Sequence, residues 1–186
     1  MTDDTTTPAA GATAEITRPI LRHQDADLYY RERFDGIGIG YYGHAPMPVA
    51  ATDIVPVEDA EVMPSVLPFT EEDFAPAWAE SQRLLPSLGA AKLDEAINGL
   101  FSFTTDDMPL LGPSASVDGF WVAEAVWVTH SAGVGRAVAE WIADGHCSSC
   151  DLHECDVNRV QPHQLAPAYV LERAQQNFVE VYDIKH

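Results

Sequence analysis

The sequence predicts an α+β fold, in which strands and helices occupy separate parts of the chain. Three observations support this prediction. Short runs with alternating apolar residues, separated by turn signals, gather early in the chain. A segment with helical spacing follows them, and a strand followed by a helix ends the compact part. The sequence contains no visible internal repeat, so these segments are expected to form one small core.

The early strands are separated by polar turns. They are predicted at Pro19–His23, Leu28–Arg33 and Gly36–Tyr42, with turns at Gln24–Asp27 and at Asp35-Gly36. Gly38, Gly40 and Gly43 match the GxGxxG dinucleotide fingerprint, which requires a helix to begin at the glycines. The prolines within Ala45–Pro48 forbid that helix. We therefore interpret the three glycines as strand residues that permit close backbone approach.

A helix is predicted after a proline-rich surface connection over residues 50–68. Thr70–Asp73 resembles a capping box. Apolar residues then recur at helical spacing: Phe74, Ala77, Trp78, Leu84 and Leu85. Pro76 is expected to kink the helix or break its first turn, and Pro86 and Gly89 should end it.

The most informative stretch runs from Phe101 to Glu140. Its first residues are the end of a strand predicted over Lys92–Thr104. A turn is predicted next, at Asp106–Pro109. It then resumes as a strand at Phe120–Ala125. After this, Ser131 is expected to cap a helix that ends at Gly145 and presents Val134, Val138, Trp141 and Ile142 on one face.

The start of that helix could hold an oxygen-rich ligand. Unpaired N–H groups in a first helical turn attract negative charge, and Gly133 and Gly135 would let a flat ring approach the backbone. On pattern alone, an ordinary strand–helix packing unit is the better explanation. The chain beyond it is predicted to be irregular over residues 145–164. It should close with a helix over Pro167–Tyr182 that has Tyr169, Val170, Ala174 and Phe178 on one side.

The residue identities add a family resemblance. TxDxxPLLG at residues 104–112, followed by GFWVAEAVWVTHSAGVGRAVAEW at residues 119–141, resembles the C-terminal signature of the FAD-dependent D-amino-acid oxidase-like superfamily. The resemblance is greatest to dimethylglycine oxidases and to dimethylglycine and sarcosine dehydrogenases. It includes RPILRHQDADLYYRE, GHAPMPV and QQNFVEVYD, and so extends from about Pro19 to Asp183.

The resemblance implies a partial domain. The expected fold is the substrate-binding mixed sheet of an amine oxidase-like flavoprotein plus the C-terminal strand and helix of its FAD domain, with no complete Rossmann unit. We accordingly expect a flexible lead-in over residues 1–17, the partial oxidoreductase domain over 18–145, and an extension with a terminal helix over 146–186. In the family, a segment similar to the lead-in lies inside the substrate-binding region, which suggests a truncated or split chain.

The resemblance also implies a cofactor and site residues. FAD is the expected cofactor, contacted by Val126, Trp127, Val128 and Thr129. The family's substrate-side tyrosine falls on Tyr29, which is expected to contact both substrate and flavin. Without the resemblance, packing of a strand aromatic would explain Tyr29 equally well.

Histidines give less information about this site. The family's partner histidine is expected upstream of Met1, and the histidine that anchors the flavin covalently is also expected to be absent. We interpret His23 and His44, which match other positions, as ordinary surface or satisfied histidines.

The implied reaction is oxidation of an N-methylated glycine, such as dimethylglycine or sarcosine, to an iminium. The methyl carbon would leave as formaldehyde or pass to tetrahydrofolate. The chain alone is expected to be inactive, with the missing FAD-binding half and a folate-binding region as partners in trans. The alternative is a non-catalytic acidic interaction protein or zinc-binding protein derived from such an oxidase.

A possible metal site supports that alternative. Cys147, Cys150, His153 and Cys155 offer four sulfur or nitrogen ligands, with His146 beside them. However, they lie within nine residues, whereas structural zinc sites usually join two separated ligand pairs. A polar loop with free thiols and no bound metal is therefore the preferred interpretation.

Composition limits the partners and the compartment. Twenty-nine acidic and ten basic residues give a formal net charge of −19, which argues against nucleic acid or an anionic membrane surface as a partner. No apolar run approaches the ~20 residues that a membrane-spanning helix needs. The acidic start lacks the features of a signal peptide, and three cysteines do not suggest a disulfide framework. We therefore expect a cytoplasmic protein with a small-molecule amine substrate.

Overall fold

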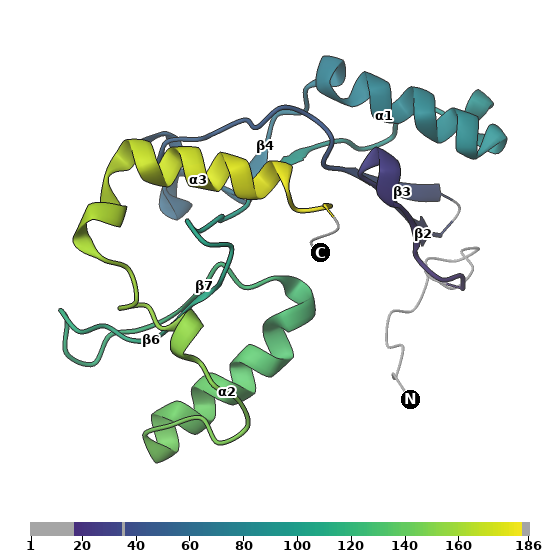
Figure 1. Ribbon diagram of the computed structural model, residues 1–186. Coiled ribbons are helices and arrows are strands. Elements are labelled where there is room, and N and C mark those ends of the chain that lie inside the picture. The colour runs from purple at the N-terminus through teal and green to yellow at the C-terminus, as the bar shows by residue number, and fades with distance from the viewer. Residues whose placement is uncertain (1–16, 35, 184–186) are drawn as a thin grey trace. The chain divides into compact units, whose positions relative to one another are not determined.

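The computed structural model describes residues 17–34 and 36–183. Its contacts divide the chain into two units, whose elements are labelled in Figure 1. The first unit comprises the described parts of residues 1–45, 68–97 and 181–186, and the second comprises residues 46–67 and 98–180. Asp35 and the predicted lead-in, apart from Thr17, lie outside the described residues. The domain boundaries predicted after residues 17 and 145 stay predictions.

The first unit contains the three predicted early strands. They are β1 (Leu21–His23), β2 (Leu28–Arg33) and β3 (Gly36–Tyr41). The strands form an antiparallel sheet in the order β1-β2-β3, with Tyr29 opposite Arg22 on one side and Gly40 on the other. Asp27 closes the turn between β1 and β2 with a left-handed φ of 52°. These strands agree with the prediction to within two residues at each end.

The core of this unit lies between one face of the sheet and helix α1 (Glu71–Leu84). Leu28 and Tyr30 are almost completely buried and pack with Ala77 of the helix. Alternate residues of a strand point to opposite faces, so Tyr29 lies on the other face of the sheet. The register of β2 thus separates a core tyrosine from a tyrosine that does not enter the core.

Helix α1 departs from the prediction at Pro76. The helix begins after Thr70, as predicted, but without the side-chain hydrogen bond of a capping box. It continues through Pro76, so a break in its first turn is wrong, whereas the alternative of a kink at Pro76 stays a prediction. Proline removes only one backbone donor and has a φ that suits a helix, and burial of Ala77 and Ser81 holds the next turns in place. The helix ends at Leu84 before a 3-10 turn over Pro86–Ala90.

The second unit is built on two small strand pairs and two helices. Its elements are β4 (Val66–Leu67), β5 (Asn98–Gly99), β6 (Leu110–Pro113), β7 (Trp121–Glu124), α2 (Ser131–Asp144) and α3 (Pro167–Val179). Strand β4 pairs antiparallel with β5, and β6 pairs antiparallel with β7, as the adjacent ribbons in Figure 1 show. An isolated parallel bridge joins Leu111 to Asp156.

The predicted strand over Lys92–Thr104 is wrong in most of its length, because only Asn98–Gly99 pairs. Phe101 and Phe103 alternate as in a strand, but their rings join an aromatic cluster with Trp127 and Phe178. The partner of β7 is instead β6, whose Leu111 is 1% exposed. The sequence analysis missed β6 because Gly112 and Pro113 obscure its short apolar run.

The two helices of this unit lie near their predicted positions. Ser131 is the first residue of α2 and not its cap, because a 3-10 turn over Val128–His130 precedes it. Ile142 is 57% exposed, and Ala137 takes the buried place on that face. Gly145 ends α2 with a φ of 79°, as predicted. Helix α3 stops at Val179, three residues before the predicted end.

The chain is therefore a mixed α and β protein with small sheets, which agrees with the α+β prediction and with a partial domain. The named strands of the described residues pair antiparallel, and one isolated parallel bridge joins Leu111 of β6 to Asp156. The correspondence of the chain to a substrate-binding half plus the end of an FAD domain stays a prediction. Within the same described residues, no helix combines the length and apolar character needed to cross a bilayer.

Candidate functional site

Tyr29 projects from the middle strand of the first sheet, on the face away from α1. Its ring lies over the backbone of Gly40, where a Cβ atom would come within 1.9 Å of the tyrosine ring. Only glycine at that position of β3 leaves room for the ring. This observation accounts for one glycine of the GxGxxG match as a strand residue with a close backbone approach. The neighbouring Tyr30 instead makes a core hydrogen bond of 3.0 Å with Ser81.

Tyr29 belongs to a row of aromatic side chains within the first unit. The centroids of Tyr29 and Tyr42 are 6.2 Å apart, and those of Tyr42 and Tyr182 are 5.0 Å apart. The guanidinium carbon of Arg22 lies 4.0 Å from the centroid of the Tyr182 ring. Tyr42 and Tyr182 were not among the predicted site residues, although the YY pair at residues 41–42 and the NFVEVYD end offered a signal.

The environment of this row favours neutral phenols. Burial, followed by the nearby Tyr29 and Tyr182 hydroxyls, raises the pKa of Tyr42 to about 12. Burial also raises the pKa of Tyr182, against the opposing effect of Arg22. Phenols that keep their protons can act as hydrogen-bond donors at neutral pH. Tyr42 and Tyr182 can therefore offer O–H groups to a bound ligand.

The four residues Val126–Thr129 form the connection between β7 and α2 in the second unit. Ala125 has a positive φ of 54°, which turns the chain at the end of the strand. The connection ends in the 3-10 turn, where the Ser131 hydroxyl donates a 2.7 Å hydrogen bond to the Val128 carbonyl oxygen. Val128 itself is 90% exposed. The structure therefore gathers these four predicted residues in one turn, while Tyr29 belongs to the other unit.

One member of the turn has a clear structural role. The Trp127 ring lies 5.6 Å from the Phe101 ring and 5.8 Å from the Phe103 ring, measured between centroids. Phe103 also contacts Phe178 of α3 edge-on. The Trp127 side chain therefore anchors the turn in the unit, and its neighbours Val128 and Thr129 are left exposed.

The residues at the start of α2 fit the edge of a flat, electron-accepting ring. A Cβ atom added at Gly133 or Gly135 would meet no protein atom within 4 Å. The helix has fourteen residues, so its first-turn N–H groups carry the partial positive charge of its dipole. An open, glycine-bearing helix start can accept charge that gathers on a ring carbonyl. Gly38 and Gly40 of the GxGxxG match lie in β3 and Gly43 follows that strand, so the match does not open this helix.

The TxDxxP signature holds two loops of the second unit together. The Arg159 guanidinium donates hydrogen bonds of 2.8 and 2.7 Å to the two carboxylate oxygens of Asp106. It also donates to the carbonyl oxygens of Met108 and Pro109. Hydrogen bonds from Arg159, followed by smaller effects, lower the pKa of Asp106. This signature is thus explained by structure and supplies no reacting group.

The two histidines near Tyr29 have local partners. The Nε2 atom of His23 lies 2.9 Å from a carboxylate oxygen of Glu80, and Nδ1 of His44 lies 2.8 Å from the Ala45 carbonyl oxygen. Glu80 also accepts hydrogen bonds from Arg83, and these together lower the pKa of Glu80 to about 2. Both histidines are thus engaged in ordinary surface contacts.

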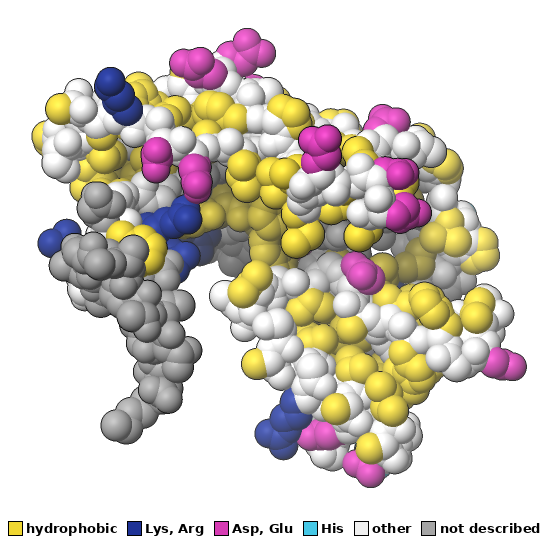
Figure 2. All heavy atoms as spheres, turned by 180° about the vertical axis from the view of Figure 1, so that it is seen from behind, with side chains coloured by type: hydrophobic (Ala, Val, Ile, Leu, Met, Phe, Trp, Pro, Cys, Tyr) yellow, Lys and Arg dark blue, Asp and Glu magenta, His cyan; other side chains and the backbone are white. Residues whose placement is uncertain are grey.

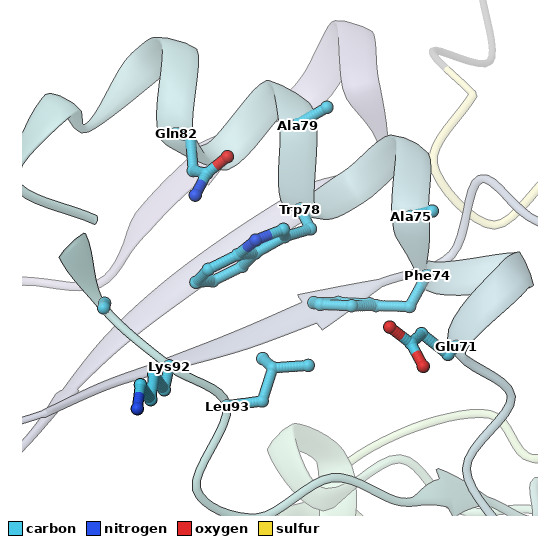
Figure 3. Close-up of a pocket in the computed structure, with 9 residues that line it drawn as sticks. Glu71, Phe74, Ala75, Trp78, Ala79, Gln82, Lys92 and Leu93 are labelled. Atoms are coloured by element: carbon cyan, nitrogen blue, oxygen red, sulfur yellow. The ribbon is translucent and has the colours of Figure 1, made fainter. Parts of the chain in front are cut away.

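A shallow hollow of about 420 Å³ lies along α1 in the first unit. In Figure 3 the Phe74 and Trp78 rings point from the helix toward Leu93, with Glu71, Gln82 and Lys92 at its edges. Tyr29 does not line it. An apolar hollow of this kind can accept an apolar side chain, but it brings together no set of groups for amine oxidation.

The candidate zinc ligands do not converge. The Sγ atoms of Cys147 and Cys150 are 3.4 Å apart, whereas His153 is paired with Asp151 at 2.9 Å. Within the described part of the chain, no three His, Cys, Asp or Glu side chains are grouped so that they could hold a metal ion.

Comparison with known proteins gives a consistent family. Residues 4–141 match the family described as FAD dependent oxidoreductase, and residues 144–186 match the FAD dependent oxidoreductase central domain. Human mitochondrial dimethylglycine dehydrogenase is 28% identical over 151 residues, which cover 76% of this chain and 16% of that protein.

Two further relatives match more of the chain. The 4-methylaminobutanoate oxidase (formaldehyde-forming) of Paenarthrobacter nicotinovorans is 26% identical over 175 residues, covering 92% of this chain and 20% of the oxidase. Human mitochondrial sarcosine dehydrogenase is 25% identical over 171 residues, which cover 89% of this chain and 18% of that dehydrogenase. The chain thus spans a fifth or less of the length of these relatives.

Proposed function

The chain belongs to the FAD dependent oxidoreductase family, and from this premise we propose that it forms part of a flavoprotein that oxidises the CH–NH group of an N-methylated glycine. Dimethylglycine and sarcosine are the proposed substrates, because two of the relatives are named for them. The methyl carbon would leave as formaldehyde, the product named for a third relative, or pass to tetrahydrofolate.

One observation carries the proposal at the level of residues. Val126–Thr129 form a turn, exposed at Val128 and Thr129, that leads into a helix with open space at Gly133 and Gly135. FAD, when bound, would accept the hydride equivalent from the carbon next to the amine nitrogen. The backbone N–H groups of this turn would stabilise the negative charge at the ring edge.

Tyr29 is proposed to act on the substrate side. The Tyr29 side chain lies on the sheet face away from the core, and its ring packs against Gly40 of β3. These two constraints give the ring a fixed direction. A phenol held in this way can donate a hydrogen bond to the carboxylate of a small amino acid or accept one from its amine. The tyrosine row beside it would exclude water from one side of the ligand.

The partners complete the proposal. The FAD-binding half and a folate-binding region would be supplied by other parts of a longer protein or by other chains. The formal charge of −19 supports a small-molecule substrate over nucleic acid.

The test uses flavin-loaded protein, reconstituted with its missing parts, and the Tyr29→Phe substitution. Removing one hydroxyl should leave flavin occupancy nearly unchanged while it weakens substrate binding or slows flavin reduction. The expected loss is about 1–3 kcal/mol, as for one buried hydrogen bond. Anaerobic mixing with dimethylglycine or sarcosine measures flavin reduction, and glycine, which lacks the N-methyl group, is the substrate control.

Val128→Pro is expected to affect the bound flavin, which Tyr29→Phe should leave nearly unchanged. It removes a backbone N–H from the exposed turn and should therefore reduce flavin occupancy or shift the flavin spectrum. A Tyr29→Phe protein that binds substrate and reduces its flavin as the parent does would make Tyr29 a packing residue. A Val128→Pro protein with the parental spectrum and occupancy would remove the turn from the flavin site.

A further inference from the structure

A thiol pair lies directly after the C-terminal end of α2 and takes no part in the proposed flavin site. Cys147 and Cys150 are separated by two serines, and their Sγ atoms are 3.4 Å apart. A disulfide bond requires about 2.05 Å between the sulfurs, so the two Sγ atoms must move closer together for the bond to form. Cys150 is exposed and Cys147 is half-buried, so a small reagent can reach the pair.

The loop that carries the pair is held against α2 by one carboxylate. The Oε2 atom of Glu140 accepts hydrogen bonds from the Ser148 N–H and hydroxyl, each at 3.1 Å, and from the Ser149 hydroxyl at 3.2 Å. Its Oε1 atom accepts a 2.9 Å hydrogen bond from Arg136 of the same helix. Glu140 thus fixes the peptide between the two cysteines before any bond forms.

The surroundings distinguish the two thiols. The Ser149 hydroxyl lies 3.3 Å from the Cys147 sulfur, and this contact is the main effect that lowers the pKa of Cys147. The hydrogen bond with Cys147 is the main effect that raises the pKa of Cys150. Because the two sulfurs are 3.4 Å apart, a group attached to the Cys147 sulfur leaves Cys150 within reach of that sulfur.

The third cysteine has a different environment. Cys155 lies in a separate 3-10 turn over His153–Cys155, outside the Cys147–Cys150 pair. Burial raises the pKa of its thiol. Cys155 is therefore a matched control in the same loop region.

We propose that Cys147 and Cys150 form a reversible intrachain disulfide, a thiol-modification site whose reagent is a small disulfide such as oxidised glutathione. The Cys147 thiolate attacks one glutathione sulfur, the glutathione disulfide bond breaks, and one glutathione thiolate leaves. The Cys150 thiolate then attacks the Cys147 sulfur, and the second glutathione leaves. Two electrons pass from the protein dithiol to oxidised glutathione, and the two glutathione thiolates take up the two protons of the cysteines.

The experiment places the full 186-residue chain in glutathione buffers of defined ratio, quenches with acid, alkylates the remaining thiols and maps them by mass spectrometry. The expected product is a single Cys147–Cys150 link with Cys155 alkylated. Cys150→Ser should accumulate a glutathione adduct on Cys147, and Cys155→Ser should oxidise as the parent does. Equal reaction of all three cysteines, or links between chains in place of the internal link, would overturn the proposal.

Glu140→Ala tests the positioning role of the carboxylate. Alanine keeps the helix, but the loop loses the acceptor that holds it, so the disulfide should become about tenfold easier to reduce, or about 30 mV for two electrons. The double variant Ser148→Ala with Ser149→Ala should also make the disulfide easier to reduce, and it leaves the sequence of α2 unchanged. Unchanged equilibria in both variants would remove Glu140 from the proposal. Stoichiometric zinc on the reduced chain that blocks oxidation would overturn the disulfide itself.

Discussion

Two adjacent tyrosines on β2 have different surroundings because a strand repeats every two residues. Tyr30 is 3% exposed and lies in the core with Leu28 and Ala77, whereas Tyr29 lies over Gly40 on the opposite face. Ser81 donates its own hydroxyl proton to the Ala77 carbonyl oxygen, so the Tyr30 hydroxyl must donate to Ser81. The role of Tyr30 is therefore structural.

Tyr30→Phe should lower the free energy of unfolding by about 1 kcal/mol, since one buried hydrogen bond is lost and the volume is conserved. Ser81 keeps its bond to Ala77, so no buried donor is left without a partner. Urea unfolding followed by circular dichroism measures the change. In flavin-loaded protein the same variant should reduce its flavin at the parental rate, and a slower rate would show that the two tyrosines have been assigned to the wrong roles.

Gly112 of β6 is a second position where a single atom matters. Its φ is 107°, and an added Cβ would lie 2.6 Å from the Trp141 ring of α2. Gly119, in the turn before β7, also has a positive φ, of 73°, but nothing lies near its Cβ position. The pair therefore separates backbone strain from overpacking.

Gly119→Ala should cost about 1–2 kcal/mol from its left-handed backbone alone. Gly112→Ala should cost about 1–3 kcal/mol more, because the Trp141 ring must move as well. Thermal and urea unfolding compare the two variants, and tryptophan fluorescence reports the displacement of Trp141. Equal destabilisation by the two substitutions would mean that the Trp141 ring accommodates the methyl group without strain.

Strands and helices were predictable where one face is buried and the turn residues are distinctive. The three strands of the first unit satisfy both conditions, and the ends of α2 and α3 are marked by Gly145 and Pro167. The Phe101–Thr104 segment alternates too, but aromatic packing with Trp127 and Phe178 takes the place of strand pairing. Such a choice depends on partners far along the sequence, which local patterns do not contain.

The candidate site shows the same limit. The turn at Val126–Thr129 follows from a strand-then-helix pattern and from the family resemblance, so the sequence was sufficient to find it. The contact of Tyr42 with Tyr182 joins positions 140 residues apart, and no spacing rule indicates it. Likewise, Asp106 was recognised as part of a signature, but its partner Arg159 became evident only from the fold.

The Asp106–Arg159 pair makes the second unit sensitive to acid. The pKa of Asp106 is lower in the folded chain than its ordinary value of about 3.9, chiefly because of Arg159. Its stabilising contribution is therefore complete above that value and is lost as the pH falls through the lowered folded pKa. Arg159 is 12% exposed and Asp106 is 43% exposed, so solvent screening reduces the contribution.

Arg159→Ala should lower the free energy of unfolding by about 1.5–3 kcal/mol at neutral pH, toward the lower limit because of that exposure. The difference from the parent should narrow below about pH 4, since the parent then loses the same interaction. Urea titrations at several pH values measure both effects. Arg136→Ala, which removes an exposed pair within α2, is the control and should cost no more than about 0.5 kcal/mol. If the difference in free energy of unfolding between Arg159→Ala and the parent does not change with pH, the Asp106 carboxylate is excluded as the cause of the destabilisation.

The whole chain exposes many apolar side chains for its size. The most exposed large ones include Val128, Val57, Met63, Val62, Ile20 and Leu165. Figure 2 shows yellow hydrophobic side chains spread over the displayed face, interspersed with acidic groups. Large contiguous apolar patches mark interaction surfaces, whereas apolar side chains exposed singly are ordinary. The proposed partners of this chain, which spans 16–20% of its relatives' length, are the remaining parts of a larger flavoprotein.

The final prediction concerns FAD and the purified chain alone, which should bind the cofactor weakly or not at all. The proposed flavin contact is the turn at Val126–Thr129, and the GxGxxG match has Gly38 and Gly40 in β3, where it does not open a helix. Absorbance after gel filtration in excess FAD measures retained flavin, with a dye that fluoresces on apolar surfaces as a measure of the exposed faces. Addition of the FAD-binding half from a relative should raise flavin retention and lower dye binding together. Stoichiometric flavin on the isolated chain, reduced by dimethylglycine, would contradict the prediction and show that this chain is a complete catalyst.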